Sequence, residues 1–272
     1  MKAVRFLSAV RREPVSAEEN GYPFTLPLIR DFERLAFPSA VTFFAGENGS
    51  GKSTLLEALA AASGAVAAGS HDIRQDPTMS GPRRLARALV LERGARAATR
   101  LFVRAEDVFG FASRVELEMR GFLEQEEAMD ADGPIAPGSG RARMRAALRG
   151  SRQALEGRYG EDPHARSHGE LFLQLLQQRL VPRGLYFLDE PETPLSPTRV
   201  LALIATILGC VRAGSQFVIA THSPLLMAVP DATIYVFAEG RIRAVAYDDV
   251  EHVALTRSFL QSPERYLRHL VD

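Results

Sequence analysis

The sequence predicts an α/β fold, with a mostly parallel sheet that has helices on both faces. Strand-like apolar segments span residues 41–45, 184–190 and 216–221, and helical patterns follow the first two directly. Such alternation of strand and helix is typical of a parallel sheet, because a parallel connection needs a crossover that is usually a helix.

The N-terminal part is expected to add an antiparallel β portion to this sheet. Residues 2–37 contain short strand-like runs that are broken by turns rich in Pro and Gly. The strand at 41–45 then enters a glycine-rich turn, which a helix at 52–62 follows. Residues 64–82 are predicted to form a loop, and residues 83–93 a basic amphipathic helix.

The middle of the chain is predicted to form a small helical lobe, within 65–166 of a single domain that spans 1–272. A strand at 101–103 leads into a helix. Residues 127–140, with the sequence EAMDADGPIAPGSG, have the Gly, Pro and Asp content of a flexible loop, and an Arg-rich helix at 141–157 follows. The insertion is too short for a long antiparallel arm.

The C-terminal part continues the pattern with a helix at 196–213. A hairpin is expected at 233–246, with its turn at Glu239-Gly240. Helices are expected to close the chain.

Composition favours a globular protein of the cytoplasm without a membrane span of its own. Apolar residues make up 46% of the chain, and the 33 basic and 33 acidic residues balance. This balance gives no global field toward nucleic acid or membranes, although a local Arg patch could still contact DNA. The single cysteine, Cys210, allows no internal disulfide, and no apolar run approaches the roughly 20 residues that a spanning helix needs.

The strongest motif is the turn after the strand at 41–45. It matches the phosphate-binding loop pattern G-x-x-x-x-G-K-[ST], also called Walker A. Its glycines let backbone N–H groups surround an anion, Lys52 can reach the β- and γ-phosphates, and Ser53 can join a Mg²⁺ shell. The alternative is a plain glycine turn that caps a helix. The expected nucleotide-binding residues are Gly46, Glu47, Asn48, Gly49, Ser50, Gly51, Lys52, Ser53 and Thr54.

Two further strand ends supply candidate catalytic groups. The apolar run 185–188 ends in Asp189, which would hold Mg²⁺ through a water, and in Glu190, which is placed to polarise an attacking water. The strand at 216–220 leads to His222, a candidate contact for the γ-phosphate. Either feature alone is more often structural, and the phosphate-binding loop is what favours a functional reading.

The order of the motifs along the chain resembles that of ABC-type ATPases. This order is a phosphate-binding loop, a Ser-x-Gly-Glu helix start, Asp-Glu and a His at a strand end. That class includes transporter motor subunits and the Rad50, SMC and RecF relatives. The segments SHGE, LDEPETPLSP and SPERYLRHL resemble compact bacterial proteins described only as AAA-family predicted ATPases, over nearly the whole chain. The resemblance implies ATP and Mg²⁺ as ligands. Motif order argues against the AAA+ ring ATPases.

The resemblance also gives a role to the segment 167–170. In ABC-type ATPases the matching segment binds the γ-phosphate of ATP held by the other subunit, which implies this role for Ser167 and Gly169, while His168 replaces a glycine of the pattern. Ser167 and Glu170 also have the spacing of a capping box. Both readings are kept, because a capped helix start is also what an anion site needs.

Some positions of the family pattern have no clear match. Glu106 and Gln75 are candidates for the glutamine that senses Mg²⁺, and Tyr22 and Phe24 for the aromatic that stacks on adenine. Ser196 takes the place of the usual dimer-contacting Asp. It also reads as the N-cap of a helix that starts at Pro197.

The resemblance implies an ATP-hydrolysing protein that works through ATP-driven head-to-tail homodimerisation, with DNA or an effector protein as a partner in repair-like or defence-like processes. Two alternatives stay open: the ATPase subunit of a membrane transporter, and a nucleotide-dependent switch with little turnover. The Arg-rich helix at 141–157 could contact a phosphate backbone or simply form a solvated face.

Overall fold

The computed structural model describes residues 5–14, 21–68, 76–160 and 168–268. It has a seven-stranded sheet in the order β10-β9-β3-β8-β7-β6-β4, in which only the β9–β10 pair is antiparallel. The mostly parallel α/β fold is therefore confirmed. The strands are β3 (Val41–Gly46), β4 (Val66–Ala67), β6 (Arg100–Arg104), β7 (Leu185–Asp189), β8 (Gln216–Ala220), β9 (Thr233–Ala238) and β10 (Arg241–Val245).

Strand register aligns the carboxyl ends of the central strands. Phe44 of β3 lies opposite Ala220 of β8, which lies opposite Asp189 of β7, which lies opposite Arg104 of β6. The residues that follow these four strands therefore meet at one edge of the sheet. This is the edge at which ligands bind in open α/β sheets.

A second, antiparallel sheet has the order β2-β1-β5, with β1 (Leu7–Arg12), β2 (Arg34–Ala36) and β5 (Leu89–Arg93). This confirms the expected antiparallel portion but corrects the helix predicted at 83–93. The helix α3 covers Ser80–Arg87, and β5 follows because Leu89 and Leu91 pack into the core while the strand pairs with β1. Tertiary pairing here overrides the local helical pattern.

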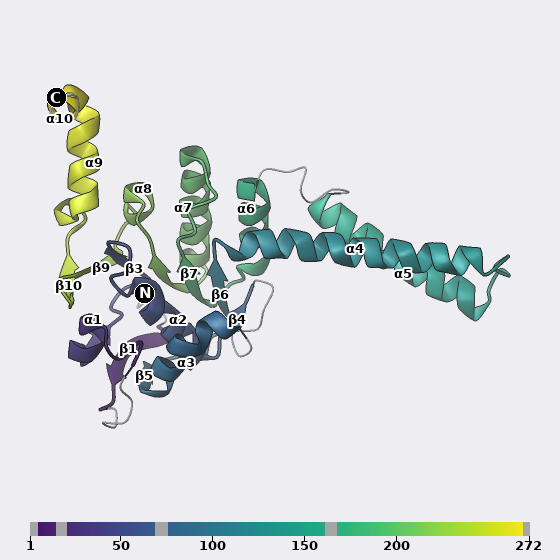
Figure 1. The fold of residues 1–272 in the computed structure, drawn as a ribbon, viewed down its shortest axis with the longest axis horizontal. Coiled ribbons are helices and arrows are strands. Elements are labelled where there is room, and N and C mark those ends of the chain that lie inside the picture. Colours follow the sequence, from purple (N-terminus) through teal and green to yellow (C-terminus); the bar gives the residue numbers. More distant parts are fainter. Residues whose placement is uncertain (1–4, 15–20, 69–75, 161–167, 269–272) are drawn as a thin grey trace.

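Helices cover both faces of the large sheet (Figure 1). On one face α2 (Lys52–Ser63) packs with Phe44, Phe187 and Val218. On the other, α6 (His168–Arg179), α7 (Pro197–Arg212) and α8 (Pro224–Met227) pack on alternate residues of the same strands, Phe43, Leu188 and Ile219. Because successive strand residues point to opposite faces, the sheet is apolar on both sides, as a buried parallel sheet must be.

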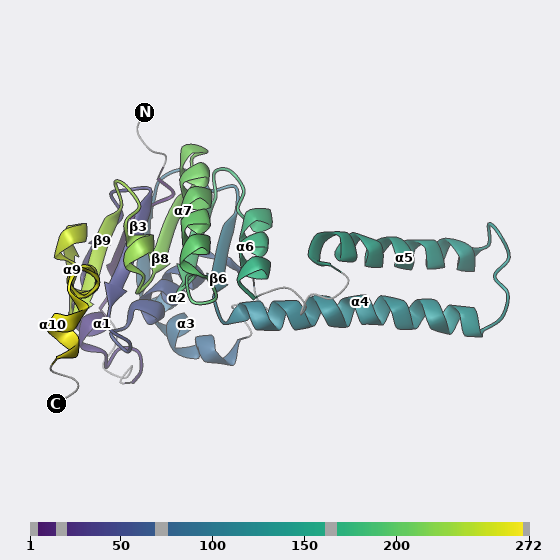
Figure 2. The same cartoon turned by 90° about the horizontal axis from the view of Figure 1, so that it is seen from above.

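The expected helical lobe is a hairpin of two antiparallel helices that projects from the body (Figures 1 and 2). They are α4 (Asp107–Ala131) and α5 (Gly140–Tyr159). At 1.5 Å per residue the 25 residues of α4 span about 37 Å, so the hairpin is longer than the small lobe that was expected. Val115, Met119 and Tyr159 anchor its root in the core.

Two boundaries of this region need correction. Residues 65–106, which were assigned to the lobe, contribute β4 and β6 to the large sheet and β5 to the small one. The segment 64–82, expected to be a loop, also contains the 3₁₀ turn η1 (Pro77–Met79). The flexible loop expected at 127–140 is narrower, because α4 continues through Ala131 before the Gly and Pro residues stop it.

The C-terminal segments lie beside β9 and β10. The expected hairpin is confirmed: Glu239 and Gly240 both have positive φ, 51° and 70°, as a two-residue hairpin turn of type I′ requires. The chain then forms η2 (Tyr247–Asp249), α9 (Glu251–Gln261) and α10 (Pro263–Leu267), and a short helix α1 (Pro27–Asp31) lies near β10. In the described part of the chain no helix combines the length and the apolar character that crossing a bilayer requires.

Candidate functional site

The predicted phosphate-binding loop connects β3 to α2, and its glycines are conformationally required. Gly46, Gly49 and Gly51 have φ values of 138°, 79° and 95°, in the region that side chains disfavour. A Cβ on Gly46 would also lie 2.4 Å from the carbonyl oxygen of Phe237. The Ser50 hydroxyl is buried, and no described residue forms a hydrogen bond with it. This loop therefore has the backbone and an unmatched polar group that fit an anion such as a triphosphate.

Lys52 is folded over this loop. Its Nζ donates to the carbonyl oxygens of Gly46 and Glu47, each at 2.7 Å, and the residue is 3% exposed. Burial lowers the pKa of Lys52, while the carboxylates of Glu190 and Asp189 oppose that change. A buried ammonium beside two carboxylates places positive charge at the point where phosphates would meet the loop.

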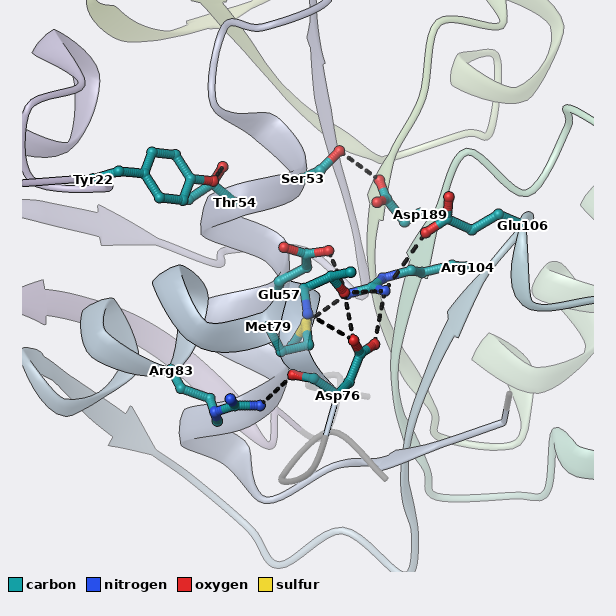
Figure 3. A network of polar contacts seen from close by, with 11 residues as sticks. Tyr22, Ser53, Thr54, Glu57, Asp76, Met79, Arg83, Arg104, Glu106 and Asp189 are labelled. Atoms are coloured by element: carbon teal, nitrogen blue, oxygen red, sulfur yellow. Dashed lines mark hydrogen bonds and ion pairs between the residues drawn. The ribbon is translucent and has the colours of Figure 1, made fainter. Parts of the chain in front are cut away.

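Ser53 and Asp189, the two predicted Mg²⁺ ligands, are brought together. Ser53 Oγ donates a 3.0 Å hydrogen bond to Asp189 Oδ1, from the first turn of α2 to the end of β7 (Figure 3). Burial raises the pKa of Asp189 to about 6. Oxygen ligands of this kind suit Mg²⁺, which keeps most of its waters and takes few ligands from the protein. The described residues hold no metal-binding group of three or more His, Cys, Asp or Glu.

Glu190 and His222 face each other across the ends of β7 and β8. Glu190 has a φ of 46°, unusual for a residue other than Gly and characteristic of functional turns. Its Oε1 lies 3.4 Å from His222 Nε2, and in the described part of the chain that buried nitrogen has no hydrogen-bond partner. Burial lowers the pKa of His222, as do Lys52 and, more weakly, His252, whose ring meets it edge-on at 5.7 Å.

The sequence reasoning missed Glu192. Its Oε1 accepts hydrogen bonds from Thr221 Oγ1, His222 N–H and Ser223 N–H. Burial raises the pKa of the Glu192 carboxyl. The available signal was the third acid in Asp-Glu-Pro-Glu, since a carboxylate two residues beyond Glu190 stays at the same edge of the sheet.

A buried ion network next to the Ser53–Asp189 pair was also missed (Figure 3). Arg104, at the end of β6 and 6% exposed, forms ion pairs with Glu57 at 2.7 Å, Asp76 at 3.2 Å and Glu106 at 3.5 Å. Burial raises the pKa of Glu57 to about 7, against the opposing effect of Arg104. The signal was an arginine at the end of a buried strand, a position that requires paired charge.

Of the two candidates for the Mg²⁺-sensing position, only Glu106 lies within the described residues. It follows β6 and lines an open pocket of about 710 Å³ together with Ser53, Asp189 and Glu190. Gln75, the other candidate, lies outside the described residues.

The aromatic candidates for adenine stacking lie near the start of α2. Tyr22 is 51% exposed, and its hydroxyl is 2.8 Å from Thr54 Oγ1. Its ring also packs so closely on Gly81 that a Cβ there would lie 2.3 Å away, and Phe24 lies under the guanidinium of Arg84 at 5.6 Å. Packing therefore accounts for both aromatics, and their role toward adenine stays a prediction.

The helix start at 167–170 is described only in part, because Ser167 lies outside the described residues and the same holds for the side chain of His168. Gly169 is buried, and a Cβ on it would lie 2.5 Å from the carbonyl oxygen of Pro194. Glu170 pairs with Arg199 of α7. Packing within the chain thus explains why position 169 is glycine, whatever the segment does toward a second subunit.

Ser196 and the Arg-rich helix both have structural explanations. Ser196 is the N-cap residue of α7 in extended conformation, with Pro197 at the first helical position, although its hydroxyl forms no capping hydrogen bond with the described residues. On α5, Arg149 and Arg152 share Glu126 of α4, and Arg145 pairs with Asp130. These arginines bind the two helices to each other, which leaves less of their charge for a phosphate backbone.

Comparisons with known proteins agree with this picture. A family model described as "AAA domain, putative AbiEii toxin, Type IV TA system" matches residues 170–228, which include the Asp-Glu and His222 segments. A model described as "AAA domain" matches residues 23–95, which include the phosphate-binding loop. Among curated proteins, none matches the sequence significantly.

Several solved structures share the general fold. UvrA2 from Deinococcus radiodurans is 18% identical, with 95% of this chain and 40% of that chain covered and a TM-score of 0.47. The structure of cbiO1 from Clostridium perfringens, part of the ABC transporter complex cbiONQ, is 16% identical; 98% of this chain and 99% of that chain are covered, and the TM-score is 0.44. The Smc head domain from Pyrococcus furiosus is 12% identical; 83% of this chain and 95% of that chain are covered, and the TM-score is 0.39. Likenesses this distant say nothing about activity or partners.

The loop between β3 and α2, with Asp189 at the end of β7 and Glu190 directly after it, defines a P-loop nucleotide-binding fold in which β8 lies between β3 and β7. The motif order along the chain resembles that of ABC-type ATPases, and the two family models that match it each describe an AAA domain.

Proposed function

We propose that this protein binds ATP with Mg²⁺ and hydrolyses it, and that ATP drives its head-to-tail dimerisation. The observation that supports hydrolysis best is the convergence of Lys52, the Ser53–Asp189 pair, Glu190 and His222 at one sheet edge. Three atoms at this edge are buried with no hydrogen-bond partner among the described residues: Ser50 Oγ, His222 Nε2 and Glu192 Oε2. A site that only bound nucleotide would not need the carboxylate of Glu190 opposite the histidine.

Each group has a role that follows from its position. Lys52 and the loop N–H groups would hold the β- and γ-phosphates, and Ser53 and Asp189 would hold Mg²⁺, whose charge neutralises the phosphate oxygens. Glu190 would polarise the attacking water, and His222 Nε2 would contact the γ-phosphate.

The dimer part of the proposal rests on the family resemblance of Ser167 and Gly169. In a two-fold dimer, one subunit's phosphate-binding loop would face the other's α6 start, so that one interface builds two sites. The ATPase part does not depend on this and could hold in a monomer.

The hairpin of α4 and α5 would carry the signal outward. It begins one residue after Glu106, which lines the pocket beside Ser53 and Asp189. A change in the position of Glu106 on nucleotide binding or hydrolysis would therefore be transmitted directly to α4, and so to the whole hairpin. We infer a cytoplasmic protein that acts on an effector protein or on DNA. The paired arginines of α5 make contact with DNA through that helix the weaker option.

Light scattering of the Glu190→Gln protein, with and without ATP and Mg²⁺, tests the proposal. Without the water-polarising carboxylate, ATP should accumulate in a closed dimer, so that the mass rises from 29.8 kDa to twice that value. Lys52→Ala in the same background is the control and should stay monomeric. A mass that ignores ATP would contradict dimerisation, and a Lys52→Ala protein with unchanged ATP affinity would contradict the site itself.

A further inference from the structure

Glu192 lies against the turn that carries His222, two residues beyond Glu190. Its Oε1 accepts hydrogen bonds from Thr221 Oγ1 at 2.5 Å, from His222 N–H at 2.9 Å and from Ser223 N–H at 3.1 Å. Donors from three consecutive residues converge on one oxygen atom. The carboxylate therefore fixes the path of the chain between β8 and α8.

This turn has few other acceptors for its N–H groups. Thr221 N–H still bonds to Phe44 of β3, but the His222 N–H has only Glu192 as an acceptor in the described part of the chain. Buried N–H groups need a partner, so loss of the carboxylate would force the turn to move toward another one. The imidazole would move with the backbone that carries it.

The same side chain ties the His222 turn to the turn after Glu190. Glu190 N–H donates to Ala220 at 2.9 Å, and Thr193 N–H donates back to Glu190 at 3.0 Å, so the segment that carries Glu192 is itself rigid. The second oxygen of Glu192, Oε2, is buried and has no hydrogen-bond partner among the residues that the structure describes. If Glu192 served only stability, a hydrogen bond to Oε2 would be expected as well. Instead, all three hydrogen bonds that Glu192 accepts go to Oε1, and all three hold the turn of His222.

We propose that Glu192 is a positioning residue for ATP hydrolysis, which holds His222 where its Nε2 meets the γ-phosphate opposite Glu190. The inference rests on the proposed function of the site. It differs from a purely structural role in one respect: its loss should affect ligands that carry a γ-phosphate and spare ADP, because ADP does not reach His222.

The test compares the affinity of a non-hydrolysable ATP analogue with that of ADP, so it needs no turnover. The variants are His222→Ala, Glu192→Ala, Glu192→Gln and the double alanine variant. We expect Glu192→Ala to lower the preference for the analogue about tenfold, as loss of one hydrogen bond to a charged group does, with ADP affinity within about twofold. The double variant should be no worse than His222→Ala, because both residues act through one contact. Glu192→Gln, which keeps an accepting oxygen, should stay within about threefold of the wild type.

Two controls separate the possible failures. Glu264→Gln removes an exposed carboxylate on α10 and should change nothing. If Glu192→Ala does not fold, Glu192→Asp keeps the charge but shortens its reach, and it should show the same selective loss. An unchanged analogue preference in Glu192→Ala, or additive losses in the double variant, would overturn the positioning role alone. Wild-type protein that binds neither nucleotide, or Lys52→Ala that binds both as the wild type does, would instead overturn the proposed function.

Discussion

Ser53 Oγ and Asp189 Oδ1 are joined by a 3.0 Å hydrogen bond across the gap between α2 and β7. The two residues are 136 positions apart in the sequence, and each belongs to a different motif. Their contact shows that the phosphate-binding loop and the Asp-Glu strand end form one site. The hydroxyl and the carboxylate are also the two protein oxygens that a Mg²⁺ ion with bound waters would need.

Asp189→Asn should therefore remove the effect of Mg²⁺ on ATP binding without removing binding itself. The amide oxygen can still accept from Ser53, so the loop should keep its shape, but the charge that attracts the ion is lost. We expect ATP affinity in Mg²⁺ to fall about tenfold or more, toward the value measured in EDTA. Titration calorimetry with and without Mg²⁺ would measure this, and a Mg²⁺ response equal to the wild type would contradict the assignment.

Gly169→Ala should destabilise the protein even though alanine favours a helix. The propensity gain is about 1 kcal/mol, but the new Cβ would lie 2.5 Å from the Pro194 carbonyl oxygen, which belongs to a rigid turn. Overpacking of this kind costs about 1–3 kcal/mol, so we expect a lower melting temperature. The exposed helical glycine Gly150, whose Cβ would meet nothing within 4 Å, is the matched control, and Gly150→Ala should leave the melting temperature unchanged or raise it.

The sequence predicted the site motifs better than the elements around them. The phosphate-binding loop, Asp189, Glu190 and His222 could be placed because each follows a strand whose apolar run is unmistakable, and parallel strands share one carboxyl edge. The strand Leu89–Arg93 could not, because the basic segment 83–93 has the pattern of one helix, and only the pairing of residues 89–93 with β1 makes them a strand.

The supporting residues were hidden for a different reason. Arg104 and Glu57 are charged residues whose importance appears only when the fold buries them next to each other. Glu192 depends on donors 29 to 31 positions away in the sequence. Spacing within a single sequence does not reveal such long-range pairs, whereas it does reveal a local motif.

Glu57→Gln should flatten the pH dependence of stability. The pKa of Glu57 is about 7 in the folded protein against an ordinary value of 4.5, chiefly because of burial. Between these values the folded state binds more protons than the unfolded state, so the free energy of unfolding falls as the pH rises from 4.5 to 7. The shift corresponds to about 3 kcal/mol. The neutral glutamine removes this fall.

Urea denaturation at pH 5 and pH 8 would measure the difference. Asp189, with its pKa near 6, contributes a fall of the same sign in both proteins, so the comparison between the wild type and Glu57→Gln isolates Glu57. Glu264→Gln, which replaces an exposed carboxylate, should keep the wild-type dependence. Identical pH dependence in Glu57→Gln and the wild type would show that Arg104 keeps this carboxylate ionised.

Ser167→Arg should separate the two interpretations of the helix start at α6. If this segment faces the γ-phosphate of a second subunit, a large cation there blocks closure of the dimer while each monomer still binds ATP through its own Lys52. We expect the ATP affinity to stay within about twofold of the wild type, and we expect no ATP-dependent rise in mass in the Glu190→Gln background. The ATPase activity should fall at least about tenfold, since loss of one contact to the charged transition state is worth that much. Gln261→Arg, which adds the same charge at an exposed position of α9, controls for net charge. A variant that dimerises and turns over normally but melts at a lower temperature would leave Ser167 with a capping role only, since loss of an N-cap typically costs about 1 kcal/mol of stability.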